Sequence, residues 1–381
     1  MPDIDGAETF EGPLFHTTAW PDNLDLKGKR VAVIGSGASG YQLTPVVAKQ
    51  AEHVTVFQRQ ASWVFDVPGY THPFTDEYLW LERNFPFFNH FMRFRLCWIS
   101  GPDIQTPTLR IEPGYTGDDF ARSPWNKRVL EQRRAFIQKK LGHIPGLPEK
   151  MTPKSPPLAT RWVLVDDEDS IYDALGQGKA SVITDPIDKI VKNGILTKDG
   201  VLHPADIIVY ATGFKANDFL WPMDIVGRDG ARTEKLWEKD GPRAYMGTML
   251  PGFPNFFMIY GPNTNNFGGL QIVDLQEMMT RFGLECIAYL ISSGKKAVEV
   301  STAAYWNYND ELDRNEALMI YADPRAVTYY KNASGRSSTN CAIDVRKMWR
   351  WLRDPSGARS ALYDVEKDPV RPVFGADLEV R

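Results

Sequence analysis

The stretch Lys27–Gly40, KGKRVAVIGSGASG, decides the fold. Its apolar residues 31–34 predict a buried strand of a parallel sheet, and Gly35-x-Gly37-x-x-Gly40 follows at once and opens a predicted helix. Gly35 permits a tight turn, Gly37 lets the backbone approach a pyrophosphate, and Gly40 lets the helix pack closely on the strand. The pyrophosphate would lie at the helix N-terminus, where free N–H groups favour negative charge. The stretch therefore predicts a dinucleotide-binding turn in a doubly wound α/β fold.

The end of the next predicted strand, residues 54–57, indicates which dinucleotide is bound. A site for NAD or FAD would place Asp or Glu here to hold the ribose 2′-hydroxyl. This chain has Gln58-Arg59-Gln60 instead, and a guanidinium can pair bidentately with a 2′-phosphate. We therefore expect NADPH rather than NADH. The alternative is that Arg59 is an ordinary solvated side chain.

Composition excludes several classes of protein. The chain has 381 residues and a net charge of −4, which argues against a nucleic-acid binder with a concentrated basic face. Its three cysteines are far apart and show no metal-ligand spacing, so we expect no metal site and a cytoplasmic setting. Charged residues interrupt the aromatic segment 78–100, so it predicts a buried amphipathic helix, with an interfacial helix as the alternative, and no membrane span.

A rarer pattern precedes the glycine turn. Phe10, Gly12, His16, Trp20 and Pro21 form F-x-G-x-x-x-H-x-x-x-W-P. This pattern, followed by the nucleotide glycines, resembles the fingerprint of type I Baeyer–Villiger monooxygenases in the flavin-containing monooxygenase superfamily. Five fixed residues at fixed spacing would occur by chance in roughly one of several thousand chains of this length.

Three later segments agree with the resemblance. Ala211-Thr212-Gly213-Phe214 is similar to the family's A-T-G-F box, and Gly261-Pro262-Asn263 is similar to the segment that returns to the flavin. The stretch 156–161 resembles the family segment that carries the active-site arginine, which would be Arg161. The family often has Lys just before this arginine, and this chain has Thr160, which weakens the expectation of a strong NADPH preference.

The resemblance implies a domain organisation. Residues 1–28 would be an interdomain linker that carries the fingerprint, and residues 29–205 an NADP-binding domain with a helical insertion at about 73–141. Residues 206–381 would be the C-terminal portion of an FAD-binding domain with a helical tail. Within this scheme the hydrophobic patterns predict strands at residues 180–183, 189–192, 195–197, 206–210 and 256–260.

The resemblance also implies a reaction. NADPH would reduce FAD, and a C4a-peroxyflavin would insert one oxygen of O₂ next to a ketone or aldehyde carbonyl. Arg161 would stabilise the developing negative charge, while His16 would act in domain coupling more than in contact with substrate. The expected cofactor-binding residues are Gly35, Ser36, Gly37, Ser39, Gly40, Gln42, Arg59, Thr212, Gly213 and Asn263.

One part of the family pattern is absent from this sequence. The family carries a strand and G-x-G-x-x-G unit for FAD before the fingerprint, and here only nine residues precede Phe10. We therefore expect this chain to be the C-terminal portion of a larger enzyme whose N-terminal segment binds FAD. Two alternatives remain, which are a flavin enzyme that oxygenates nitrogen or sulfur and a non-catalytic NADP-binding remnant. A structural role for Arg161 also remains open.

Overall fold

The computed structural model describes residues 1–266, 270–353 and 378–380, and it divides the chain into two compact units. Unit 1 comprises Met1–Leu79 and Tyr115–Phe214, and unit 2 comprises Trp80–Gly114 and Lys215–Arg381. Each unit is described by itself.

A five-stranded parallel sheet forms the centre of unit 1, with strand order β1-β10-β2-β3-β6. The strands are β1 (Leu14–His16), β2 (Arg30–Ile34), β3 (His53–Phe57), β6 (Ala180–Ile183) and β10 (Ile207–Tyr210). The chain passes from β2 through a helix to β3 on one side, while β10 lies on the other side of β2. The strand order therefore reverses at β2, where a doubly wound fold binds its ligand.

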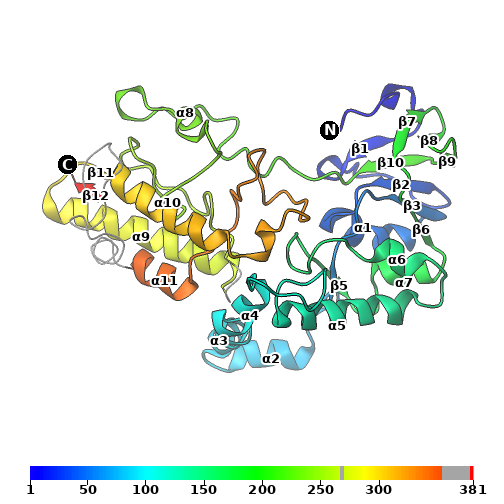
Figure 1. Cartoon of the computed structure of the whole chain (residues 1–381), viewed down its shortest axis with the longest axis horizontal. Coiled ribbons are helices and arrows are strands. Elements are labelled where there is room, and N and C mark those ends of the chain that lie inside the picture. The colour runs from blue at the N-terminus through cyan, green and yellow to red at the C-terminus, as the bar shows by residue number, and fades with distance from the viewer. Residues whose placement is uncertain (267–269, 354–377, 381) are drawn as a thin grey trace. The chain divides into compact units, whose positions relative to one another are not determined.

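Helices cover one face of this sheet and a small antiparallel sheet covers the other (Figure 1). The helices of unit 1 are α1 (Ala38–Ala48), α5 (Pro124–Leu141), α6 (Leu147–Met151) and α7 (Ile171–Gly176). The antiparallel sheet consists of β7 (Ile187–Val191), β8 (Gly194–Thr197) and β9 (Leu202–Pro204). A separate parallel pair joins β4 (Val64–Val67) to β5 (Val163–Asp166). Two 3-10 helices, η1 (Ala7–Thr9) and η2 (Thr17–Ala19), flank β1.

The two faces of β2 explain why its sequence is continuously apolar. Val31 and Val33 lie in the core shared with the helices, whereas Ala32 and Ile34 lie in the core shared with the β7–β9 sheet. Successive side chains of a strand point to opposite faces, so a strand covered on both faces needs apolar residues throughout. The expected α/β fold with a parallel sheet is confirmed.

Residues 1–28 contain more structure than a connecting loop. Strand β1 pairs in parallel with β10, and the strand is too short to show an alternating pattern in the sequence. Gly12 lies two residues before this strand, and a Cβ there would lie 2.2 Å from the carbonyl oxygen of Asp206. The glycine of the fingerprint therefore lets β1 approach the backbone before β10.

Unit 2 is mainly helical. Its helices are α3 (Phe88–Ile99), α4 (Pro102–Leu109), α8 (Thr233–Trp237), α9 (Ile272–Ser293), α10 (Thr302–Glu316) and α11 (Val345–Arg353), with η3 (Arg228–Gly230) and η4 (Ile320–Ala322). The helix α2 (Asp76–Asn84) contains the boundary between the two units. Strands β11 (Val298–Val300) and β12 (Leu378–Val380) form an antiparallel pair.

Two expectations for this part of the chain are wrong. Residues 256–260 form no strand, because Tyr260 has a left-handed φ of 64° and Met258 N–H donates to the Thr248 carbonyl in an irregular loop. The segment 78–100 is helical but not buried, since α2 and α3 contain no buried residue. In α3 Arg93 instead bonds Asp274 and Glu277 of α9 through its guanidinium.

The expected domain boundaries stay a prediction. Helices do follow one another through 76–141, as the proposed insertion requires. The stretch 80–114 of that insertion belongs to unit 2 by its contacts, however, and β10 belongs to the sheet of unit 1.

Candidate functional site

The carboxyl ends of four parallel strands bring most of the expected site residues to one edge of the unit 1 sheet. His16, Tyr210, Ile34 and Phe57 are register partners in a single row across β1, β10, β2 and β3. The segments that follow these residues carry the remaining motifs of unit 1, since Gly35 follows β2, Arg59 follows β3, and the A-T-G-F box follows β10. This edge lies at the point where the strand order reverses, which is where open α/β sheets bind ligands.

The three glycines of the turn differ in what surrounds them. Gly35 has a φ of 124°, and a Cβ there would lie 2.3 Å from the carbonyl oxygen of Ala211. A Cβ on Gly40 would lie 2.1 Å from the carbonyl oxygen of Gly35. A Cβ on Gly37, in contrast, would meet no atom within 4 Å. The turn therefore needs Gly35 and Gly40 for its own packing, whereas Gly37 leaves open space beside the backbone.

The N-terminus of α1 faces this open space. Gly37 caps the helix without a side-chain hydrogen bond, and the first turn of α1 contains no acidic residue. Ser39 lies in that turn and is partly buried, while Gln42 donates from Nε2 to the carbonyl oxygen of Leu164 in β5 at 2.8 Å. The free N–H groups and the helix dipole favour an anion here, such as a pyrophosphate.

Ser36 connects the glycine turn to the segment after β3. Its hydroxyl donates to the carbonyl oxygen of Gln60 at 2.5 Å, and the hydroxyl of Ser62 donates to the carbonyl oxygen of Ser36 at 2.7 Å. These reciprocal bonds fix residues 59–62 beside the turn. The side chain of Ser36 is thus engaged within the chain, and its expected contact with a cofactor stays a prediction.

Arg59 is a cation at this edge. Its side chain is exposed, and its guanidinium makes no hydrogen bond or ion pair with any residue that the structure describes. The preceding residue, Gln58, is buried, accepts a hydrogen bond from the Tyr41 hydroxyl at 2.7 Å and donates to the Lys150 carbonyl at 2.8 Å. The backbone before Arg59 is therefore held in place while its charge stays available.

The A-T-G-F box lies beside His16. Thr212 and Gly213 are exposed, Gly213 has a φ of 89°, and a Cβ there would meet no atom within 4 Å. The ring of Phe214 packs edge-on against the imidazole of His16, with ring centroids 5.6 Å apart. This contact joins the fingerprint to the box at the ends of β1 and β10.

His16 is held in one orientation. Its Nδ1 accepts the backbone N–H of Thr18 at 3.3 Å and lies 2.9 Å from the Thr18 hydroxyl. Because Nδ1 is an acceptor, a neutral imidazole carries its proton on Nε2. The structure brings His16 to the same edge as the glycine turn and leaves its role as a prediction.

Arg161 lies just before β5 and is exposed, with no partner for its guanidinium in the described part of the chain. The Val163 N–H donates to the Trp63 carbonyl at 2.9 Å, so the Arg161 segment lies next to the segment after β3. Thr160 is partly buried and carries no charge. An arginine without a partner in the described residues suits the expected catalytic role, which stays a prediction.

Asn263 is the one expected site residue in unit 2, and its side chain is engaged there. It is fully buried, its Nδ2 donates to the carbonyls of Ser337 and Asn340 at 2.8 Å each, and its Oδ1 accepts from Arg336 at 2.7 Å. The amide thus has a partner in each direction within the chain. A contact between this side chain and a cofactor stays a prediction that would require these bonds to change.

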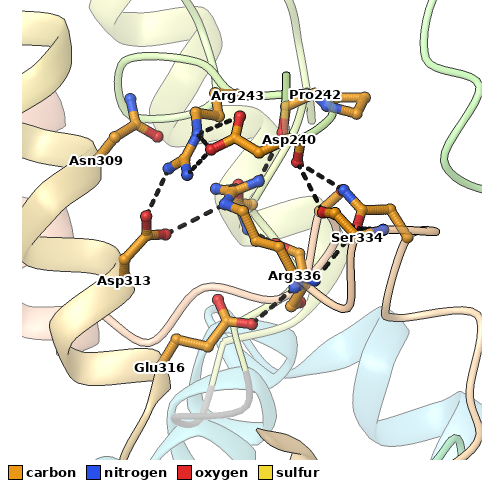
Figure 2. Close-up of polar contacts among 12 residues, drawn as sticks. Asp240, Pro242, Arg243, Asn309, Asp313, Glu316, Ser334 and Arg336 are labelled. Atoms are coloured by element: carbon orange, nitrogen blue, oxygen red, sulfur yellow. Dashed lines mark hydrogen bonds and ion pairs between the residues drawn. The ribbon is translucent and has the colours of Figure 1, made fainter. Parts of the chain in front are cut away.

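Arg336 belongs to a network of charged side chains in unit 2 (Figure 2). It donates to Asp313 on α10 at 3.2 Å and to the Pro242 carbonyl at 2.9 Å. Arg243 lies 2.8 Å from the second oxygen of Asp313 and bonds Asp240 as well. The network joins α10 to three loops. No local pattern in the sequence predicts it, because Arg336 is 94 residues from Pro242 and 73 residues from Asn263.

Glu316 closes this network on the α10 side. One carboxyl oxygen accepts the Ser337 N–H at 3.0 Å, and the other has no hydrogen-bond partner in the described residues. Burial raises the pKa of this carboxyl from 4.5 to about 7, although the charge of Arg336 opposes the rise.

No group of three or more His, Cys, Asp or Glu side chains in residues 1–266, 270–353 and 378–380 is placed to hold a metal ion. No helix in these same ranges combines the length and the apolar composition that crossing a membrane requires.

Comparison with known proteins gives matches over the whole chain. A family model described as flavin-binding monooxygenase-like matches residues 2–92. A Baeyer–Villiger monooxygenase from Pseudomonas aeruginosa is 31% identical over 353 residues, which cover 92% of this chain and 62% of that protein. The phenazine N-monooxygenase PhzNO1 from Lysobacter antibioticus is 30% identical over 362 residues, which cover 89% of this chain and 65% of that protein.

A solved structure agrees with these matches. The oxidised steroid monooxygenase bound to NADP has a TM-score of 0.76 and 25% identity, and the match covers 100% of this chain and 72% of that one. The chain spans about half the length of several curated relatives that it matches. The similarity thus extends across this chain but not across the full length of its relatives.

Proposed function

The chain belongs to the flavin-binding monooxygenase-like superfamily, and we propose that it forms the NADPH-binding portion of a Baeyer–Villiger monooxygenase. One observation carries the proposal. At the carboxyl edge of the unit 1 sheet, a glycine turn with open space at Gly37 lies beside Arg59, a cation without a partner in the described residues. An NAD site would have a carboxylate at this position, and a carboxylate would repel a 2′-phosphate.

Each part of this edge has a task in binding NADPH. The pyrophosphate lies at the N-terminus of α1 beside Gly37, where the absence of a side chain permits close approach. Arg59 bonds the 2′-phosphate, and the bonds of Gln58 to Tyr41 and Lys150 keep its backbone in place. Preorganisation of this kind lowers the entropic penalty of binding.

FAD, when bound, would accept a hydride from NADPH and activate O₂ for transfer to a ketone or aldehyde. In this chain Arg161 would hold the negative charge that develops on the reacting oxygens, since its guanidinium is exposed and free of carboxylates in the described residues. His16 and Phe214 would couple movement of the linker to the end of β10 through their ring contact. Thr212 and Gly213 would contact nucleotide with exposed backbone. A cytoplasmic setting remains part of the proposal.

A second reaction has an observation in its favour. One of the relatives is a phenazine N-monooxygenase that is about as similar to this chain as the Baeyer–Villiger relative. Oxygenation of nitrogen or sulfur therefore remains the alternative to insertion next to a carbonyl.

The test uses this chain fused to the part of the Pseudomonas aeruginosa relative that the match does not cover. Oxygen uptake and NADPH oxidation would be followed with matched ketones, sulfides and amines. We expect ketone-dependent turnover that Arg161→Ala abolishes while NADPH oxidation continues. Product formation from amines or sulfides alone would favour the alternative, and flavin binding without any substrate-dependent turnover would leave only an NADP-binding function.

A further inference from the structure

The helix α3 of unit 2 exposes a row of large aromatic side chains. Phe91, Phe94 and Trp98 are 59%, 59% and 70% exposed. Because they are spaced by three and four positions, they lie on one side of the helix and form a continuous surface, the aromatic stripe. The rings of Phe94 and Trp98 are neighbours, with centroids 5.9 Å apart. Contiguous exposed apolar patches are typical of interaction sites.

A different side of α3 attaches the helix to α9. The guanidinium of Arg93 bonds Asp274 and donates to Glu277 at 2.6 Å, and the Cys97 thiol donates to Asp274 at 3.9 Å. Arg93 and Cys97 are four residues apart, so they share one side of the helix. The attachment therefore fixes α3 through its polar residues and leaves the aromatic stripe uncovered in the described part of the chain.

Three cations accompany the stripe. Arg95 lies on α3, and Arg350 and Arg353 lie on α11. All three side chains are exposed, and none forms an ion pair with any residue that the structure describes. The guanidinium of Arg353 lies 4.6 Å from the centre of the exposed Trp349 ring, so α11 also combines cations with an aromatic side chain.

An ion pair places α11 beside the corner between α3 and α4. Arg346 of α11 donates to Asp103, in the first turn of α4, at 3.1 Å (Figure 1). The Gly101 N–H donates to the Trp98 carbonyl at 3.2 Å, so the chain turns sharply from the end of the stripe to α4. Arg350 lies four residues after Arg346 and hence on the same side of α11. The cations of both helices thus belong to one region of unit 2.

The charge of this region is opposite to that of the chain. Neither α3 nor α11 contains Asp or Glu, although the net charge of the chain is −4. The one carboxylate of α4, on Asp103, is paired with Arg346. A second copy of the chain docked here would bring like charges together, which opposes self-association. A surface of negative charge with an apolar layer beneath it would instead match both the cations and the rings.

We propose that the aromatic stripe, with Arg95, Arg350 and Arg353, is a peripheral binding surface for membranes that contain anionic lipids. The rings enter the boundary between headgroups and acyl chains, and the guanidiniums stay at the level of the lipid phosphates. This inference goes beyond the proposed function, and its test involves no nucleotide.

The test measures sedimentation of the full chain with vesicles of phosphatidylcholine alone and of an equimolar mixture of phosphatidylcholine and phosphatidylglycerol. We expect binding to the mixed vesicles only, and added salt should weaken it. Trp98→Ala should weaken binding about tenfold because apolar area is lost from the interface, and Arg95→Ala about fivefold. Both side chains are exposed, so both variants should unfold at the wild-type urea concentration.

Trp125→Ala and Arg128→Ala are the matched controls. These residues form another exposed tryptophan–arginine pair, on α5 of unit 1, with 4.7 Å between the guanidinium and the ring centre. Neither change should affect vesicle binding. Trp98→Phe should retain binding but reduce the quenching of protein fluorescence by brominated lipid, because residue 98 would lie within the acyl boundary.

Equal sedimentation with both kinds of vesicle, or equal effects of Trp98→Ala and Trp125→Ala, would overturn the proposal. Absence of vesicle binding would overturn it too, and a dimer that Trp98→Ala dissociates would then assign the stripe to a second copy of the chain.

Discussion

Gly37 and Gly40 show at the residue scale how one motif serves both folding and binding. Gly40→Ala would place a Cβ 2.1 Å from a backbone carbonyl, so we expect a loss of about 2 kcal/mol in the free energy of unfolding. Gly37 has an ordinary φ of −75° and open space around it. Gly37→Ala should therefore unfold at nearly the wild-type urea concentration yet bind NADPH about tenfold more weakly. Equal effects of the two variants on stability would contradict the structure.

Arg59 gives a second prediction at this scale. Arg59→Ala should weaken binding of NADPH by roughly tenfold to a hundredfold, because a hydrogen-bonded charge on the 2′-phosphate is lost. Binding of NADH should change little, and calorimetric titration of both nucleotides would measure the difference. Arg128→Ala provides a control on the exposed surface of α5. An equal loss of affinity for NADPH and NADH would show that Arg59 does not contact the 2′-phosphate.

The sequence predicted the positions of the glycine turn after β2 and of Arg59 after β3, because both depend on local spacing, and their roles in binding stay a prediction. It could not predict that the Asn263 amide is engaged, since its partners Ser337 and Asn340 are 74 and 77 residues away. The same holds for Gln58, whose bond to the Lys150 carbonyl fixes the segment before Arg59.

At the scale of elements, the charged network attaches α10 to the loops of unit 2, and Glu316 makes this attachment depend on pH. Its folded pKa of about 7 lies above the unfolded value of 4.5, so the fold prefers the protonated carboxyl. The contribution of this carboxyl to the free energy of unfolding is fully present below pH 4.5. It decreases as the carboxyl ionises in the unfolded state, and it is lost once the pH passes about 7. The decrease is at most about 3 kcal/mol.

Glu316→Gln should remove this dependence. A glutamine cannot ionise, and its side-chain oxygen can still accept the Ser337 N–H. Urea unfolding at pH 5, 6, 7 and 8 should show the variant gaining stability relative to the wild type as pH rises. Glu234→Gln, an exposed glutamate in α8, is the matched control and should show no such trend. A constant difference across this range would refute the raised pKa.

The sequence predicted elements where the hydrophobic pattern was long or continuous. Strands β2, β3, β6 and β10 are confirmed to within a residue or two. It missed β1, which has three residues and owes its conformation to β10. It wrongly predicted a strand at 256–260, where Phe256, Phe257 and Met258 pack in an irregular loop of the unit 2 core and the segment finds no partner strand among the described residues.

At the scale of the whole molecule, the chain contains two compact units, and all residues of the proposed NADPH site lie within unit 1. Every described residue assigned to that site belongs to one sheet edge or to segments hydrogen-bonded to it. We therefore expect unit 1 to bind nucleotide without flavin or substrate. The proposed oxygenation would also require FAD.

The most direct test of this account compares the affinities of the full chain for NADPH and NADH, measured by titration calorimetry at low and moderate salt. We predict that NADPH binds at least about tenfold more tightly and that salt narrows the difference. Equal affinities, or tighter binding of NADH, would contradict the account.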